Sequence, residues 1–320
     1  MQNIKWGIIG LGNIARKFAD DLQKIPNAEL FAVASRSKVR SEQFAAEYKA
    51  QKAYDSYAEL AEDNNIDAVY IATPHSFHKD HSILCMLHNK AVLCEKPLAM
   101  NYLEVSEMIA VAKTQNVLFM EALWTYFLPH YQYVLNLIKS KALGEVISLE
   151  ADFGFHKPFD SENRLFKKEV GGGSLLDVGI YPIFVALTTL GIPQEIEASA
   201  TFLENGIDAD CTIAFTYPKA KAILKSAIQK ETATEAIFTC ELGKIIISSP
   251  FYSPTTVVVE KNGIETIDFG VKTIGYNYEI EHFNALIRDR KKESDLMTFE
   301  CSELLIKTLD TVREKIRLVY

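Results

Sequence analysis

The chain has 320 residues, 48% of them hydrophobic and 24% charged, which is typical of a globular protein with room for two hydrophobic cores. A formal net charge of −8, with no basic stripe to offset it, argues against a nucleic-acid-binding protein. No apolar run approaches the ~20 residues that a membrane helix needs, and the first predicted strand begins too early for a secretory signal, so we expect no membrane partner. The five scattered cysteines match no metal or redox spacing, so we expect reduced thiols in a cytoplasmic protein.

An apolar run at residues 6–9 leads into a turn of the form Gly-x-Gly-x-x-Ala, after which helical spacing begins. A strand, a glycine turn and a helix in this order form the pyrophosphate site of a dinucleotide-binding domain, although an ordinary tight turn is the alternative. Gly10 permits the turn, Gly12 lets the backbone approach the phosphates, and the helix start offers free N–H groups. The residues predicted to bind the cofactor here are Gly10, Gly12, Asn13, Ile14 and Ala15.

The rest of the first third alternates apolar strands with amphipathic helices. We predict strands at 30–34, 68–72, 91–94 and 117–120, and helices at 41–49, 56–63, 78–89 and 102–114. This alternation is typical of a parallel, doubly wound Rossmann sheet. We therefore assign residues 1–122 to a dinucleotide-binding domain of the α/β class.

The pattern changes near residue 123. One predicted helix, at 129–140, is followed by a strand at 146–153 and a strand-rich region at 195–270, and two helices close the chain. Residues 123–320 are therefore predicted to form an α+β domain on a large, mostly antiparallel open sheet, which binds substrate and mediates oligomerisation. An open sheet leaves one face to cover, so we expect a homodimer.

The second predicted strand should carry the residues that distinguish NAD from NADP. In NAD sites an acidic residue there holds the ribose 2′-hydroxyl, but this position reads Ser35-Arg36-Ser37-Lys38-Val39-Arg40. Ser35 can form a hydrogen bond, and Arg36 or Arg40 can pair with a 2′-phosphate. We therefore expect NADP(H) rather than NAD, although a solvated loop with ordinary surface cations is the alternative.

Three further segments could carry chemistry. The first follows a strand end, where doubly wound sheets bind ligands, and contains Thr73, Pro74, His75 and His78. Its histidine spacing matches no usual metal motif, so we predict lining or helix-start roles and no metal site.

The second segment, Cys94-Glu95-Lys96-Pro97, places a lysine at the end of the next strand, where it could polarise a carbonyl or hold a hydroxyl, or simply lie in a surface turn. The third, Gly171 to Pro182, has Ser174 as a candidate helix cap. It also places Asp177 and Tyr181 four residues apart on one predicted helical face. A capped helix with a buried tyrosine is the alternative interpretation of this third segment.

Together, Gly10-x-Gly12-x-x-Ala15, Glu95-Lys96-Pro97 and the segment from Gly171 to Tyr181 resemble the glucose–fructose oxidoreductase / inositol dehydrogenase / rhizopine catabolism (Gfo/Idh/MocA) family over nearly the whole chain. Many relatives have histidine at the position of Tyr181. The tyrosine, with the stretch from Met120 to Thr125, is most similar to the dimeric dihydrodiol dehydrogenase and NADP-dependent D-xylose dehydrogenase branch. That branch often has arginine after Trp-Thr, where this chain has Tyr126, so the substrate does not carry over.

The resemblance implies an oxidoreductase in which Lys96 and Tyr181 face the nicotinamide and the Lys96–Pro97 peptide is cis. A nearby ammonium favours tyrosinate, so the pair could remove a hydroxyl proton from a sugar, anhydro-sugar or vicinal diol. Asp177 would orient Tyr181 or touch the substrate. The expected cofactor contacts also include Glu95, Pro97 and Trp124, and the expected pocket walls are Trp124, Phe153, His156, Phe159 and Arg164. The alternative function is a non-catalytic NADP-binding regulator on the same fold.

Overall fold

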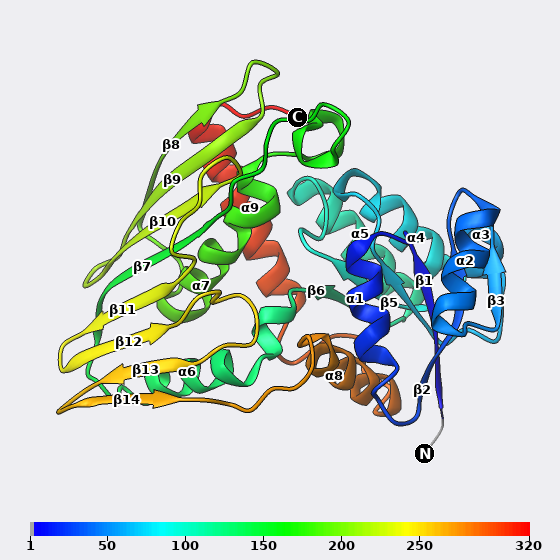
Figure 1. Ribbon diagram of the computed structural model, residues 1–320, viewed down its shortest axis with the longest axis horizontal. Helices are drawn as coiled ribbons and strands as arrows, with labels where there is room; N and C mark the ends of the chain where they lie inside the picture. Colours follow the sequence, from blue (N-terminus) through cyan, green and yellow to red (C-terminus); the bar gives the residue numbers. More distant parts are fainter. Residues whose placement is uncertain (1–2) are drawn as a thin grey trace. The chain divides into compact units, whose positions relative to one another are not determined.

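The computed structural model describes residues 3–320 and divides the chain into two compact units (Figure 1). The first extends to Tyr126 and also contains Lys272–Ile306; the second contains Phe127–Val271 and Lys307–Tyr320. The sequence predicts a boundary between residues 122 and 123 and assigns everything beyond it to the second domain. The structure instead places Lys272–Ile306 with the first unit, because this segment packs on α1 (Asn13–Leu22).

The first unit is built on a six-stranded, all-parallel sheet in the order β3-β2-β1-β4-β5-β6. The predicted doubly wound sheet is confirmed. Its strands are β1 (Ile4–Ile9), β2 (Ala28–Ala34), β3 (Lys52–Tyr54), β4 (Ala68–Ile71), β5 (Ala91–Glu95) and β6 (Phe119–Ala122). Only β3 was not predicted, because its three residues are too short to show a period. The strand order reverses between β1 and β4, which is where such sheets bind ligands.

The helices of the first unit lie where amphipathic spacing predicts them. They are α1, α2 (Lys38–Tyr48), α3 (Tyr57–Glu62), α4 (His78–Leu87), α5 (Tyr102–Gln115) and α8 (Tyr276–Arg288). Asn101 caps α5, because its side chain accepts a hydrogen bond of 3.0 Å from the N–H of Glu104. α1 packs beside α8, whereas α3, α4 and α5 pack against one another in sequence.

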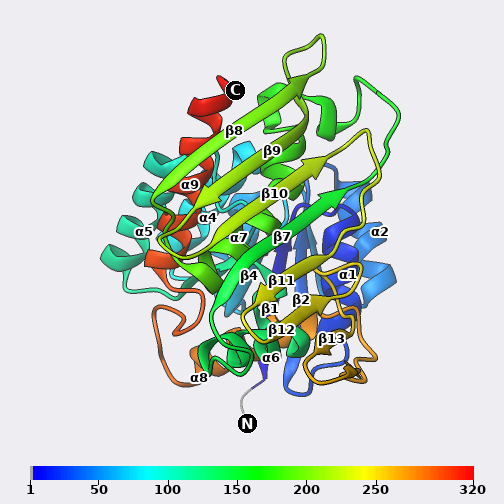
Figure 2. The ribbon, with the colours of Figure 1, turned by 90° about the vertical axis from the view of Figure 1, so that its left-hand side faces the viewer.

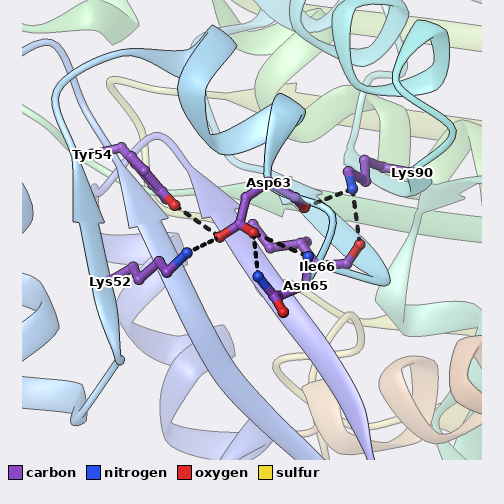
Figure 3. A network of polar contacts seen from close by, with 6 residues as sticks. All are labelled: Lys52, Tyr54, Asp63, Asn65, Ile66 and Lys90. Atoms are coloured by element: carbon purple, nitrogen blue, oxygen red, sulfur yellow. Dashed lines mark hydrogen bonds and ion pairs between the residues drawn. The ribbon is translucent and has the colours of Figure 1, made fainter.

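A polar network closes the connection between α3 and β4 (Figure 3). The carboxylate of Asp63 accepts hydrogen bonds from Lys52 Nζ at 2.7 Å and the Tyr54 hydroxyl at 2.8 Å. It also binds the backbone and side-chain N–H groups of Asn65. Lys90 is buried and donates to the carbonyl oxygens of Asp63 and Ile66. Two cations, Lys52 on β3 and Lys90 immediately before β5, thus hold one loop, which fixes the start of β4.

The second unit is built on an eight-stranded sheet in the order β14-β13-β12-β11-β7-β10-β9-β8 (Figure 2). Only β7 and β10 pair in parallel; all other described pairs are antiparallel, which confirms the predicted α+β class. The strands are β7 (Val146–Gly154), β8 (Glu195–Phe202), β9 (Asp208–Thr216), β10 (Lys221–Ala227), β11 (Ala236–Cys240), β12 (Gly243–Ile247), β13 (Val257–Glu260) and β14 (Ile264–Ile267).

Helices α6 (Pro129–Lys139) and α7 (Ile180–Leu190) pack on one face of this sheet. A π-helical turn, Leu175–Gly179, runs directly into α7. Among the described residues, the stretch Lys168–Leu190 is long and apolar enough to cross a membrane by those two measures alone, but 94% of its most apolar window is buried within the protein. It is therefore the core helix of the second unit. α9 (Phe299–Ile316) closes the chain.

Candidate active site

The glycine turn after β1 has the geometry that a phosphate-binding turn needs. Gly10 has a φ of +91°, and a Cβ on it would lie 2.7 Å from the backbone at the end of β4. A Cβ on Gly12, in contrast, would have no atom within 4 Å. Gly12 begins α1 without a side-chain cap, so the first N–H groups, at Asn13 and Ile14, are left for an anion. Ala15 is fully buried against the strand, as the motif requires.

The loop after β2 presents cations to solvent. Arg36, Lys38 and Arg40 are exposed, and neither arginine forms an ion pair with any described residue. Ser35 is buried, and its hydroxyl donates to the Ser37 carbonyl oxygen at 2.8 Å. Ser35 therefore shapes the loop, and the exposed cations of Arg36, Lys38 and Arg40 are available to a phosphate.

The segment after β4 is held by a buried histidine. In His78, Nε2 lies 2.7 Å from the Thr73 carbonyl oxygen and Nδ1 lies 2.8 Å from that of Pro97. Burial lowers the pKa of His78 to about 4, so the ring is neutral and donates to one carbonyl at a time. His78 thus ties the loop after β4 to the loop after β5. Pro74 precedes the 3-10 turn His75–Phe77, in which His75 is also buried.

Lys96 follows the last residue of β5 in a turn with a cis peptide bond to Pro97, as the resemblance implies. The turn rests on Glu95, which accepts hydrogen bonds from the Tyr70 hydroxyl and from the N–H of Lys96, the latter at 3.1 Å. Tyr70 is fully buried. Glu95 therefore fixes the backbone that carries Lys96, while the lysine side chain is half-buried.

Two buried carboxyl groups in this unit were not predicted. Glu121, on β6, accepts a hydrogen bond of 3.0 Å from the N–H of Leu98, and burial raises its pKa to about 7. Glu279, on α8, is fully buried, and burial raises its pKa well above the usual value. An isolated glutamate in a strand or helix gives no sequence signal of this kind.

Trp124, one of the predicted cofactor-contact residues, stacks on Tyr276, with the ring centroids 4.6 Å apart and the ring planes at 9° to each other.

In the second unit, the π-helical turn and α7 carry the remaining predicted residues. Asp177 is nearly buried, and its carboxylate pairs with Arg164 at 3.0 Å. Ser174 does not cap the helix, because its backbone is already helical and its hydroxyl donates to Asp208 instead. Asp177 and Tyr181 were expected on one α-helical face, but the π turn between them widens the backbone and changes that spacing.

Tyr181 lies in a cluster of aromatic rings. Its centroid is 5.6 Å from Phe153 and 5.3 Å from Tyr252, and the last two stack at 4.1 Å. Tyr252 was not predicted, since it lies in a loop far along the chain. The loop is anchored by Phe251, whose carbonyl oxygen contacts His130 Nε2 at 3.0 Å. The cluster leaves Tyr181 only 6% exposed.

The other expected wall residues are less enclosed. His156 is exposed, and Phe159 is 53% exposed with its ring edge on Phe166. A hollow of about 350 Å³ lies at the opposite end of α7 from Tyr181, lined by residues such as Thr189, Leu190 and Tyr217. None of the predicted site residues lines it, so we do not assign it to the active site. Within residues 3–320 no cluster of three or more His, Cys, Asp or Glu side chains is placed to hold a metal ion.

Comparisons with known proteins agree with this arrangement. Residues 4–123 match the family model "Oxidoreductase family, NAD-binding Rossmann fold", and residues 131–246 match "GFO/IDH/MocA C-terminal domain". The chain is 37% identical to a trans-1,2-dihydrobenzene-1,2-diol dehydrogenase of Xenopus laevis, covering 99% of each sequence. It is 34% identical to a scyllo-inositol 2-dehydrogenase (NADP(+)) of Bacillus subtilis (strain 168), covering 99% of this chain and 98% of that one.

Solved structures show the same fold. A 3-ketoreductase from Actinomadura kijaniata, solved with NADP and TDP-benzene, superposes with a TM-score of 0.90 at 25% identity over 98% of both chains. An aldose-aldose oxidoreductase from Caulobacter crescentus has a TM-score of 0.90 at 20% identity, over 99% of this chain and 98% of that one. Both units thus match the two halves of one enzyme family, and the chain belongs to the Gfo/Idh/MocA family of NAD(P)-dependent oxidoreductases.

Proposed function

We propose that this enzyme uses NADP(H) to oxidise or reduce a small polyhydroxylated substrate, such as a sugar, an anhydro-sugar or a vicinal diol. The observation that carries the proposal is the placement of Lys96 at the carboxyl end of β5, on a turn fixed by Glu95 and buried Tyr70. That edge of a doubly wound sheet is where ligands bind. A polyol or carbonyl substrate also agrees with the names of the relatives.

NADP(H) is favoured over NAD by the charges after β2. Arg36 and Arg40 are exposed without ion-pair partners, and the loop has no carboxylate to hold a ribose 2′-hydroxyl. When bound, NADP⁺ supplies a hydride acceptor at C4 of the nicotinamide. The glycine turn fits the pyrophosphate, because Gly12 leaves space and α1 offers uncapped N–H groups.

The chain's own residues handle the proton. In oxidation the Tyr181 oxygen would accept the hydroxyl proton of the substrate while the bound cofactor would take up the hydride of the carbinol C–H bond, so that the alcohol becomes a carbonyl. Reduction reverses each step. The ammonium of Lys96 stabilises the tyrosinate and holds the substrate oxygen. Asp177, paired with Arg164, orients Tyr181 or a substrate hydroxyl. Trp124, which stacks on Tyr276, and Phe153, which lies beside Tyr181, are apolar groups that we propose contact the substrate.

The test is a spectrophotometric panel. NADP⁺ reduction is followed at 340 nm with aldoses, inositols and cyclic vicinal diols, and NADPH oxidation with dicarbonyls and ketosugars. We expect turnover with at least one polyol class and its loss in Lys96→Met. Turnover confined to substrates without a vicinal hydroxyl, or with NAD alone, would contradict the proposal.

We also propose that the enzyme is a cytoplasmic homodimer that covers the open face of the large sheet. Side chains that lie opposite one another on neighbouring strands form a row across that face. In order, the row contains Ile223, Glu150, Ile237, Ile246 and Val258, and all but Glu150 are branched and apolar. β7 and β10 are neighbours, with Lys225 opposite Asp152. A twofold axis along these strands would set Lys225 opposite Asp152 of a second copy, so the face is complementary in charge to itself.

Analytical ultracentrifugation tests the dimer. Ile246→Glu should give a monomer, whereas Leu103→Glu, at a 78% exposed position on α5, should not change the oligomeric state. A monomeric native protein at micromolar concentration would overturn this proposal. Cell fractionation tests the location, which is consistent with five free cysteines.

A further inference from the structure

The segment that carries Asp177 and Tyr181 begins at a cluster of three buried polar side chains from three elements. Asp208 lies at the start of β9, Ser226 on β10, and Ser174 immediately before the π-helical turn. Asp208 and Ser174 are 0% exposed, and Ser226 is 2% exposed. None of the three belongs to the predicted site. Burying a carboxyl group is costly unless it is hydrogen-bonded, so its partners show what it holds.

The hydrogen bonds of this cluster all lead toward the carboxylate of Asp208. Asp208 Oδ2 accepts from the Ser174 hydroxyl at 2.8 Å and from the N–H of Leu175 at 2.6 Å. Ser174 Oγ also lies 3.0 Å from Ser226 Oγ. Because the single hydroxyl proton of Ser174 is directed at the carboxylate, Ser226 must donate to Ser174. An ionised Asp208 thus holds both the side chain and the backbone at the start of the segment.

Close packing fixes the same segment sterically. Gly173 has a φ of +114°, and a Cβ on it would lie 2.0 Å from Asp208 Oδ1. A Cβ on Gly179, at the end of the π-helical turn, would lie 3.0 Å from Ser226 Oγ. Two strands of the sheet therefore contact the segment on both sides of Asp177, and the second contact, at Gly179, lies two residues before Tyr181. With so little room, a change at Asp208 displaces the segment rather than a single side chain.

We propose that Asp208 is the positioning residue for Asp177 and Tyr181, acting through Ser174 and the N–H of Leu175. The inference rests on the proposed role of Tyr181 as proton carrier. An ionised Asp208 holds the π-helical turn against β9 and β10 and so sets the place of the Tyr181 hydroxyl. Protonation at Oδ1, which has no hydrogen-bond partner, removes the negative charge and so weakens the two hydrogen bonds that Oδ2 accepts from Ser174 and Leu175.

The surroundings of Asp208 determine the pH at which this happens. Burial raises the pKa of Asp208 to about 6, against the lowering effect of its hydrogen bonds to Ser174 and Leu175. The titratable groups that interact with it are Cys211 on the same strand and Tyr320 near the end of the chain; burial raises the pKa of both thiol and phenol. Both are neutral at pH 7. Asp208 therefore releases its proton just below neutral pH, and kcat should gain an acidic limb near pH 6.

The experiment compares Asp208→Asn with Asp210→Asn, which changes the same residue type two positions along β9 outside the cluster. kcat and KM are measured from pH 5 to 9, together with NADPH affinity and the circular dichroism spectrum. Displacing reacting groups by about 1 Å costs up to ~100-fold in rate, so we expect kcat to fall 10- to 100-fold in Asp208→Asn, with NADPH affinity within twofold of native. The limb near pH 6 should vanish, because an amide does not titrate; Asp210→Asn should keep it.

A folded Asp208→Asn enzyme with native kcat and an unchanged limb overturns the inference. If that variant does not fold, Ser226→Ala is tested instead, because it removes only the hydrogen bond to Ser174. We expect this variant to stay folded and its kcat to fall about threefold or more. A native kcat in Ser226→Ala would contradict the inference. Full activity in Tyr181→Phe would instead overturn the proposed function. The two failures are thereby separated.

Discussion

Asp21, near the end of α1, caps α8 through the backbone N–H of Tyr276, 255 residues later in the chain. The same carboxylate accepts from the N–H groups of Ile274 and Gly275, and it is 0% exposed. The other end of this link is Trp124, on which the ring of Tyr276 stacks. One buried acid thus attaches the late segment Lys272–Ile306 to the cofactor-binding unit.

We predict that Asp21→Asn lowers the free energy of unfolding of the first unit. The amide keeps one acceptor oxygen and puts an NH2 group in place of the other, so one or two of the three backbone donors lose their acceptor, and each buried donor left unpaired costs about 1–3 kcal/mol. Both tryptophans, Trp6 and Trp124, lie in this unit, so their fluorescence during urea unfolding measures it. Asp20→Asn, exposed on the same helix, is the matched control and should leave the midpoint unchanged. Equal midpoints for both variants would show that the cap contributes nothing.

The second prediction concerns the cofactor. NADP(H) should bind at least tenfold more tightly than NAD(H), since each charged hydrogen bond to a 2′-phosphate contributes roughly 1.5–3 kcal/mol. The double variant Arg36→Ala/Arg40→Ala should lose most of this difference and leave NAD(H) affinity unchanged. Fluorescence titration of both cofactors gives the affinities. A native enzyme that binds the two equally would refute the assignment.

For Lys96, we predict that Lys96→Met keeps NADPH binding and loses most of kcat. Acid–base groups contribute about 10²–10⁴-fold to rates, and methionine fills a similar volume without charge. Lys79→Met is a control, because Lys79 pairs with Glu107 on the surface of the same unit. Near-native turnover in Lys96→Met would mean that the lysine is an ordinary turn residue.

Removing only the hydroxyl of Tyr181 should remove catalysis and little else. Tyr181→Phe keeps the ring in its cluster with Phe153 and Tyr252, so we expect a native melting temperature and a kcat reduced about 10²-fold or more. Tyr181→Ala would add a cavity cost. In the native enzyme, oxidation should speed up as pH rises, because the deprotonated base accepts the proton. If Tyr181→Phe retains the native rate and pH profile, the proton carrier is another residue, and His75, His78 and Asp177 are the next to test.

We predict that Asp63 makes the free energy of unfolding depend on pH in the acidic range. Although desolvation opposes it, hydrogen bonds from Lys52, Asn65 and Tyr54 hold the pKa of Asp63 below its usual value. A carboxyl with a depressed folded pKa stabilises the protein above its unfolded pKa, about 4, and that contribution disappears as pH falls towards the folded value. Asp63→Asn should therefore reduce the unfolding free energy at pH 7 and less so at pH 3. Asp55→Asn, exposed nearby, should show no such difference in urea titrations at the two pH values.

The sequence predicts the first unit well because its information is local. Buried parallel strands appear as short apolar runs, and Asn101 with Glu104 marks the start of α5. The role of Asp21 could not be predicted, since nothing near it in sequence indicates a partner 255 residues away. For the same reason Lys272–Ile306 was assigned to the wrong domain.

In the second unit, local patterns predict the residues but not their contacts. Ser174 precedes a helix and is a standard cap type, yet its partner is Asp208 on a distant strand. The π-helical turn has no periodicity that distinguishes it from an α-helix in five residues. Tyr252 reaches Tyr181 only because a loop is folded back by Phe251. Side-chain clusters of this kind depend on the tertiary fold.

The chain order of the two units also has a consequence for synthesis. α8 is translated after the entire large sheet. Until the last fifty or so residues emerge from the ribosome, the cofactor-binding unit therefore lacks the helix that covers Trp6 and whose N-terminal backbone binds the Asp21 carboxylate. In a nascent chain stopped near residue 270, the Asp21 carboxylate would lack the three backbone N–H groups that it binds in the complete protein, and the indole of Trp6 would be exposed. We expect such chains to bind chaperones and to acquire dinucleotide affinity only at the end of translation.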